Sequence, residues 1–249
     1  MIGKLPNNFS YQSASDLVRI GRDNDGGYLV SQSDIEKTEL LIGLGISDDW
    51  SFEEDFVKLN DINVVAYDAS IGFRFWLKQA IVQTIKNPFS LYPLRKFISY
   101  RKFFKGKHEH VKKFVGLNTV SENHCTFVDM LNEADSQNIF LKIDIEGSEY
   151  RFLDDIIANE KRITGMVLEL HDCDIHLKEI KNFIKKLSLK LVHVHANNYA
   201  PIRASDGLPL VLELSFSKNC EEFVTPSLPH KLDMPNSKRS AEIRLIIDS

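Results

Sequence analysis

Short apolar runs alternate with longer helix-like stretches along most of this chain, and this alternation restricts the possible fold more than any other feature. The clearest runs are residues 38–43 (TELLIG), 63–67 (NVVAY), 139–145 (IFLKIDI) and 165–170 (GMVLEL). Strands separated by helical segments are typical of βαβ units. We therefore expect an α/β fold with one mostly parallel sheet flanked by helices.

Further elements follow from the same periodicity. A helix is predicted over residues 51–59, where Ser51 and Glu54 have the spacing of a capping box. The remaining expected elements are a strand over 110–116, helices over 126–132, 149–158 and 175–187, a closing pair of strands over 189–195 and 210–217, and one more strand over 242–247.

Residues 71–113 separate the second and third expected strands by more than a simple crossover needs. Within residues 95–113 there are eight Lys or Arg residues and one acid, interleaved with Phe97, Tyr100, Phe103 and Phe104. We interpret the segment as an inserted basic, helical lid. It could receive an acidic glycan, a lipid-linked glycan or an anionic membrane surface, or be no more than a solvated amphipathic lid. Residues 219–240, with Pro226, Pro229 and Pro235, predict an irregular connection.

The 249 residues fit one domain, residues 1–249, carrying the insertion at about 71–113. The net charge of −4 gives no basic footprint, so nucleic acid is not an expected partner. The three cysteines have no metal-type spacing, which favours reduced thiols in a cytoplasmic protein. Neither a secretory signal nor an apolar run of ~18 residues is present. The oligomeric state stays open, a homo-oligomer included.

The turn after the first strand carries Gly43 and Gly45, where glycine lets the backbone approach a ligand closely, although packing alone also explains glycine there. Asp68 ends the second strand, where Rossmann domains place an acid on ribose hydroxyls; a solvated turn residue is the alternative. A third glycine is absent, and Asp48 and Asp49 follow instead. Two carboxylates would repel a pyrophosphate but suit a cationic sulfonium, which favours S-adenosylmethionine over NAD or ATP.

Acids and histidines also follow the later strands. Asp144 and Glu146 alternate with Lys142 at the end of one strand, either facing a ligand crevice or, for Asp144, pairing with Lys142 inside the sheet. The segments 167–172 (VLELHD) and 193–199 (HVHANNY) place further polar groups at strand ends. A histidine there could accept a proton from a hydroxyl.

At these residues the sequence resembles the FkbM-type methyltransferases, a branch of the class I S-adenosylmethionine-dependent superfamily. The matching segments are 19–30 (RIGRDNDGGYLV), 43–56 (GLGISDDWSFEEDF), 126–131, 140–149 (FLKIDIEGSE) and 167–171 (VLELH), in the order of that family. The resemblance implies a Rossmann-like class I methyltransferase fold with a seven-stranded sheet. It also implies that S-adenosylmethionine binds across the ends of the first, second and fourth strands.

The resemblance further implies roles for individual residues. Gly43 and Gly45 would face the methionine part and Asp68 the ribose, while Asp25, Gly26 and Gly27 would form a loop closing over the cofactor. Asp144 and Glu146 would lie beside the transferred methyl group.

The reaction implied is methyl transfer to oxygen, with a hydroxyl of a sugar or polyketide as acceptor and polysaccharide tailoring as the context. His171 is our first choice of base and His195 the second. By similarity to related sugar O-methyltransferases, Asp144 and Asp172, together with Asn198, could hold Mg²⁺.

Two other functions remain open at the level of sequence. A nicotinamide- or nucleotide-sugar-dependent oxidoreductase shares the strand, glycine turn and acid, but Asp48 and Asp49 speak against it. A non-catalytic module that binds S-adenosylmethionine would show the same motifs. A nucleic-acid methyltransferase is disfavoured, because the Asn/Asp-Pro-Pro-aromatic motif of the amino-methylating enzymes is absent.

Overall fold

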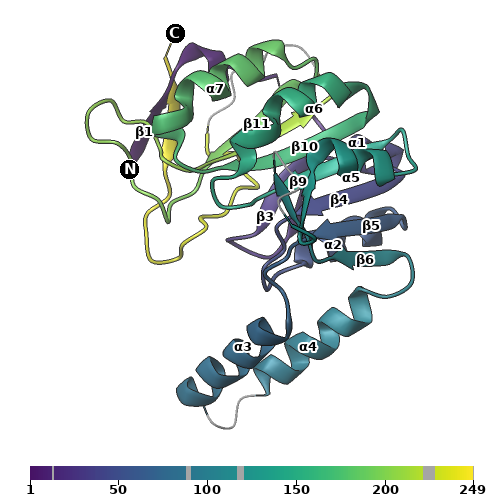
Figure 1. Cartoon of the computed structure of the whole chain (residues 1–249). Helices are drawn as coiled ribbons and strands as arrows, with labels where there is room; N and C mark the ends of the chain where they lie inside the picture. Colours follow the sequence, from purple (N-terminus) through teal and green to yellow (C-terminus); the bar gives the residue numbers. More distant parts are fainter. Residues whose placement is uncertain (13, 88–90, 117–120, 221–227, 249) are drawn as a thin grey trace.

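A seven-stranded sheet forms the centre of the computed structural model, which describes residues 1–12, 14–87, 91–116, 121–220 and 228–248 (Figure 1). Its strands are β4 (Leu40–Leu44), β5 (Asn63–Tyr67), β6 (His108–Val111), β9 (Ile139–Ile143), β10 (Ile163–Leu170), β11 (Lys190–Ala196) and β12 (Leu212–Ser217). Their order is β11-β12-β10-β9-β4-β5-β6, and only β12 runs antiparallel to its neighbours. The expected Rossmann-like, mostly parallel seven-stranded sheet is confirmed.

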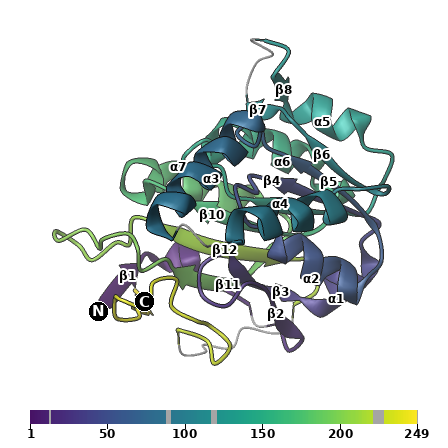
Figure 2. The ribbon, with the colours of Figure 1, turned by 90° about the horizontal axis from the view of Figure 1, so that it is seen from below.

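Both faces of this sheet are covered, which is why its central strands are apolar throughout rather than alternating. One face packs on α5 (Phe127–Glu133), α6 (Leu153–Asn159) and α7 (Cys173–Lys186). The other packs on α1 (Gln32–Lys37), α2 (Ser51–Leu59) and the hairpin of β2 (Leu17–Gly21) and β3 (Gly27–Ser31). Figure 2 shows the two layers on opposite sides of the sheet.

Several short elements lie outside the central sheet. β1 (Ile2–Leu5) pairs with β13 (Arg244–Ile247), which brings the two ends of the chain side by side (Figure 2). The expected strand over 242–247 is therefore present but does not join the main sheet. The expected strand over 110–116 is divided into the end of β6 and β7 (Phe114–Gly116), which pairs with β8 (His124–Thr126). Three 3-10 turns, Asn7–Phe9, Glu149–Phe152 and Glu160–Arg162, complete the elements.

The insertion forms two helices, α3 (Phe73–Lys86) and α4 (Tyr92–Phe103), that lie side by side and extend away from the body (Figure 1). Its helical character is as expected. Aromatic side chains near its base, Trp76, Tyr100 and Phe104, pack against the body. Of the irregular connection over 219–240, residues 221–227 with Pro226 lie outside the described residues, and the described remainder holds no helix or strand.

The start of α2 corrects one sequence prediction. Trp50 is the N-cap of this helix, and the Ser51 hydroxyl has no hydrogen-bond partner among the described residues, so Ser51 and Glu54 form no capping box. Asp49 instead accepts a hydrogen bond from the Ser51 backbone N–H (3.2 Å), while Glu54 accepts one from the Trp50 indole (3.1 Å). A capping box is found at α5, between Thr126 and Asp129.

Among the described residues, no helix has the length and apolar character that crossing a membrane requires.

Candidate functional site

A cavity of about 520 Å³ opens at the carboxyl ends of β4, β5, β6 and β9. This is the edge at which open α/β sheets bind ligands, and the volume suits a small organic molecule. The lining comes from the segments that follow each strand: residues 44–49, 67–70, 113–116 and 144–148. Arg22, Asp25 and Gly26 in the β2–β3 loop, together with Glu169 near the end of β10, also line it.

Gly45 forms part of the cavity wall where β4 and β9 end next to each other. Its φ is +80°, and a Cβ there would stand 1.8 Å from the backbone oxygen of Asp144. The Lys142 ammonium donates a hydrogen bond to the Gly45 carbonyl, holding the two strand ends together. Gly45 is therefore required by the close approach of the Asp144 backbone, which is the packing alternative for this glycine, and its contact with a ligand stays a prediction. Gly43 does not line the cavity; a Cβ there would meet the buried carboxyl of Glu53 at 2.7 Å.

Asp68 lines the cavity at the end of β5 and is only 8% exposed. One carboxylate oxygen accepts hydrogen bonds from the backbone N–H groups of Ile46 (3.1 Å) and Ser47 (2.8 Å). The other accepts from the Ser70 N–H (2.7 Å). Asp68 thus fixes the turn after β4 as well as facing the cavity. The ribose contact expected for it stays a prediction.

The β2–β3 loop closes one side of the cavity. The Arg22 guanidinium lies 3.2 Å from the Asp49 carboxylate, which joins the loop to the turn after β4. Gly26, with φ of +82°, lies beside the same carboxylate, where a Cβ would be 2.9 Å away. Asp25 and Gly26 line the cavity, whereas Gly27 begins β3 and is packed against Arg22 and Arg19. Of the expected D-G-G loop, only the first two residues reach the site.

Acidic side chains dominate the cavity wall. Seven carboxylates and four cations line it: Asp25, Asp48, Asp49, Asp68, Asp144, Glu146 and Glu169 against Arg22, Lys113, Lys142 and Arg151. Three of the cations are already paired: Arg22 with Asp49, Lys142 with Asp144 (3.5 Å), and Lys113 with Glu133 outside the lining (4.0 Å). The pair of Lys142 and Asp144 was one of the two sequence alternatives, and here it also borders the cavity. An excess of negative charge favours a cationic ligand.

Asp144, Glu169 and His171 form a cluster whose ligand atoms lie within 4.8 Å of one another. Burial raises the pKa of Glu169 to about 8, and the charges of Asp144 and Glu213 add to the shift. For His171, burial lowers the pKa, but the hydrogen bond and charge of Glu149, with the charges of Glu169 and Asp144, raise it to about 9. The cluster therefore retains protons at neutral pH.

Two further residues orient Glu169. The Tyr28 hydroxyl donates to one oxygen of Glu169 (2.9 Å) and to Asp144 (3.3 Å), and the Asn197 amide donates to the other oxygen of Glu169 (2.9 Å). Glu169 belongs to the polar segment 167–172 that the sequence placed at a strand end, but neither Glu169 nor Tyr28 was assigned a role there. The sequence does mark Glu169 as a candidate, because it is a lone acid in a buried apolar strand.

Some predicted site residues are not brought to the cavity. His195 is buried between Glu213 (2.9 Å) and Glu242 (3.2 Å) and does not line it, so its two ring nitrogens are already engaged. The Asn198 amide donates to backbone carbonyls of Ser237 and Ser240 (3.1 Å each).

Asp172 is exposed and lies outside the cluster at the start of α7. The ligand set of Asp144, Asp172 and Asn198 is therefore not assembled. Glu146 lines the cavity but is largely exposed, with its carboxylate 3.4 Å from His171.

The donor atoms of the Asp144, Glu169 and His171 cluster fit a divalent metal ion: two carboxylates and one imidazole. An imidazole in the set suits Mn²⁺ or another transition metal better than Mg²⁺, which prefers oxygen ligands. Such an ion would act there as a Lewis acid for an acceptor oxygen.

The lid role expected for the insertion stays a prediction. None of the described residues between 71 and 112 lines the cavity. The cavity is bordered instead by the β2–β3 loop and by residues 113–116 with His124.

No family model matches the sequence, and no curated protein matches it, so the FkbM resemblance is not confirmed. Solved structures with similar folds include a human methyltransferase 10 domain containing protein (12% identity, 75% of each chain, TM-score 0.40). The N-terminal domain of human METTL16 in complex with SAH matches at 12% identity over 74% of this chain and 63% of that chain, with a TM-score of 0.38. Precorrin-6y C5,15-methyltransferase from Geobacter metallireducens matches at 14% identity over 86% of this chain and 95% of that chain, with a TM-score of 0.38. Identities and TM-scores this low transfer no activity or residue role to this chain.

Proposed function

We propose that this protein is an S-adenosylmethionine-dependent methyltransferase that methylates a hydroxyl group of a sugar or glycan. The observation that carries the proposal is the acid-lined cavity across the carboxyl ends of β4, β5 and β9. Its excess of carboxylates complements a cationic sulfonium and would repel a pyrophosphate. The sugar acceptor rests on the sequence resemblance alone.

S-adenosylmethionine supplies a methyl group on a sulfonium that is already a good leaving group. The acceptor oxygen forms a bond to the methyl carbon as the sulfur–carbon bond breaks, and the hydroxyl proton passes to a base. We assign the base to the ionised form of Glu169, which lines the cavity; because its pKa is about 8, the fraction able to accept a proton grows as pH rises toward 8. His171, our first choice from the sequence, lies beside it with its ring 3.7 Å from the Glu169 carboxylate.

Isothermal titration with S-adenosylmethionine and S-adenosylhomocysteine tests the proposal without knowledge of the acceptor. Both ligands should bind. Asp144→Asn should weaken S-adenosylmethionine by about tenfold and S-adenosylhomocysteine less, because only the former carries the positive sulfur. Asp154→Asn is the matched control, since Asp154 is exposed on α6 and does not line the cavity.

If neither S-adenosylmethionine nor S-adenosylhomocysteine binds, the proposal is contradicted. It is also contradicted if NAD or a nucleotide sugar binds more tightly than these two ligands. Once binding is established, a screen of sugar and lipid-linked acceptors, with and without Mn²⁺, identifies the substrate. Binding without turnover of any acceptor would instead indicate a non-catalytic module.

A further inference from the structure

The outer face of α3 carries a continuous row of large apolar side chains. Phe73, Leu77, Ile81 and Ile85 recur every fourth residue and are 80%, 48%, 52% and 78% exposed. Residues at this spacing lie on one side of a helix. This apolar stripe belongs to a helix without a single buried residue, and α4 adds exposed Leu94 and Ile98. Exposed apolar surface of this extent marks an interaction site.

Helices α3 and α4 form a helical hairpin, the α3–α4 hairpin, whose charged residues are all basic. Between Ile71 and His108 the sequence has nine Lys or Arg residues and no Asp or Glu. Arg74 and Lys78 follow the first two residues of the apolar stripe, so a basic row runs directly beside it. Neither forms an ion pair with any residue that the structure describes. Positive charge and apolar surface are thus presented together.

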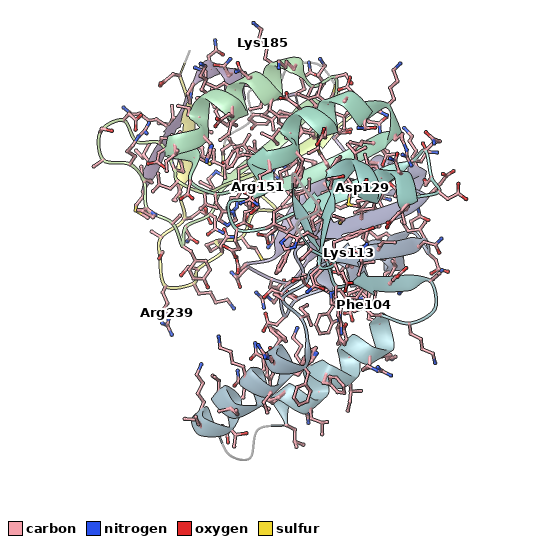
Figure 3. The ribbon with its side chains drawn as sticks, viewed as in Figure 1. Phe104, Lys113, Asp129, Arg151, Lys185 and Arg239 are labelled. Atoms are coloured by element: carbon pink, nitrogen blue, oxygen red, sulfur yellow. The ribbon has the colours of Figure 1, made fainter. Side chains whose placement is uncertain are left out.

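One side of α4 packs on the body, whereas α3 has no buried residue. Figure 1 shows α3 and α4 extending below the sheet, and Figure 3 shows their side chains pointing into solvent around the hairpin, with Phe104 at its base. The end of the hairpin nearest the sheet is attached to the body by several contacts. The Tyr100 hydroxyl bonds to His110, whose other ring nitrogen bonds to the Asp68 carbonyl (2.7 Å), and Lys96 lies 4.5 Å from the Trp50 ring centroid.

We propose that the α3–α4 hairpin docks the protein on an anionic lipid bilayer surface. The apolar stripe would enter the headgroup–acyl boundary while the flanking Lys and Arg residues contact anionic headgroups, the arrangement by which amphipathic basic helices lie on membranes. A second copy of this chain is a poorer occupant, because two hairpins without a single acid would repel each other. RNA offers phosphates but no hydrocarbon for the stripe.

Docking in this way would place the cavity near the bilayer. Ser70 lines the cavity and α3 begins three residues later, so the hairpin leaves the body at the cavity rim. A membrane-borne acceptor would then be presented to the site. This last consequence rests on the proposed methyl transfer, whereas docking itself does not, and its test needs neither methyl donor nor acceptor.

Vesicle flotation with the full chain tests the docking. Vesicles of phosphatidylcholine with phosphatidylglycerol should bind the protein, binding should weaken as salt rises, and vesicles of phosphatidylcholine alone should bind far less. Phe73→Ser with Ile85→Ser should lower the partition coefficient at least about tenfold, and Arg74→Glu with Lys78→Glu should do the same. All four positions are exposed, so folding should persist and is checked by thermal unfolding.

The matched control is Ile175→Ser with Lys185→Glu on α7, on the opposite side of the molecule from the hairpin (Figure 3). Ile175 is 73% exposed, close to Phe73 and Ile85, and this variant should bind like the wild type. Equal binding to both kinds of vesicle, or hairpin variants that bind like the wild type, would overturn the proposal. Two other results would also overturn it. In the first, the hairpin substitutions leave vesicle binding intact but convert a dimer to a monomer in light scattering. In the second, the wild type binds no vesicles but binds RNA, and the hairpin substitutions abolish RNA binding.

Discussion

The carboxyl group of Glu53 is fully buried on α2 beside Gly43, and neither of its oxygens has a hydrogen-bond partner among the described residues. Burial raises its pKa to about 7, and the charge of Lys142 opposes that shift. Because the folded-state pKa lies above the unfolded value, the folded protein holds this proton to higher pH. The contribution of Glu53 to stability is complete below about pH 4.5 and is lost as pH rises through about 7.

Replacing Glu53 with Gln should remove this pH dependence. Relative to the wild type, Glu53→Gln should gain up to about 3 kcal/mol in the free energy of unfolding between about pH 5 and about pH 8. Urea unfolding at both pH values measures it. Glu36→Gln, at an exposed acid on α1, should leave the wild-type slope unchanged. A Glu53→Gln protein with the slope of the wild type would refute this account.

A second prediction at the residue scale is that the cluster of Asp144, Glu169 and His171 binds a metal ion. The chain should bind Mn²⁺, and His171→Ala should weaken that binding at least about tenfold by removing the nitrogen ligand. Asp172→Asn should have no effect, since the structure leaves Asp172 outside the cluster. Calorimetric titration with Mn²⁺ decides between the two ligand sets. Weakening by Asp172→Asn but not by His171→Ala would restore the set that the sequence predicted.

At the scale of elements, the two helix starts with capping-box spacing behave differently. Thr126 accepts a hydrogen bond from the Asp129 N–H (2.9 Å), and Asp129 accepts one from the Thr126 N–H (3.3 Å). Thr126→Ala should therefore cost about 1 kcal/mol of stability. Ser51→Ala is the control and should cost close to nothing, because its hydroxyl caps no backbone group. Equal losses in denaturant unfolding would argue against the observed caps.

Elements could be predicted where a short stretch of sequence determines them, and were missed where pairing with distant residues determines them. β5 was predicted with its observed bounds, and β4, β9 and β10 within a few residues, because buried parallel strands are continuous apolar runs. The β2–β3 hairpin was missed. Its Asp25-Gly26 turn between apolar strands is a hairpin signal, but the segment was interpreted as a cofactor loop. Residues 110–116 did not remain one strand, since β7 pairs with β8 rather than extending the sheet.

The same distinction holds for the residues of the candidate site, some of which could be predicted from the local sequence and some of which could not. Gly45, Asp68 and Asp144 could be placed because strand ends at one edge of a parallel sheet meet there whatever the packing. Glu53 and Tyr28 come from a helix and a hairpin laid on the sheet, so only tertiary packing brings them near the site. His195 was misplaced because strand alternation gives the face of a side chain, not the partners that enclose it.

At the scale of the whole molecule, the cavity joins parts that are distant in the sequence. The ends of β4, β5 and β9 form its floor, and the β2–β3 loop is held across it by the ion pair of Arg22 and Asp49. A ligand that fills it would contact elements from both layers around the sheet. Ligand binding and global stability are therefore linked, because the unfolded chain has no such site.

The last prediction measures this linkage. S-adenosylhomocysteine at about a hundred times its Kd should stabilise the fold by about 2.7 kcal/mol and raise Tm by roughly 5–10 °C. Arg22→Ala should reduce the gain at the same ligand concentration, because it frees the loop from Asp49 and weakens binding. Arg239→Ala, at an exposed arginine that does not line the cavity, should keep the full gain. A Tm that rises with NAD but not with S-adenosylhomocysteine would assign the cavity to a nicotinamide cofactor and remove the basis for methyl transfer.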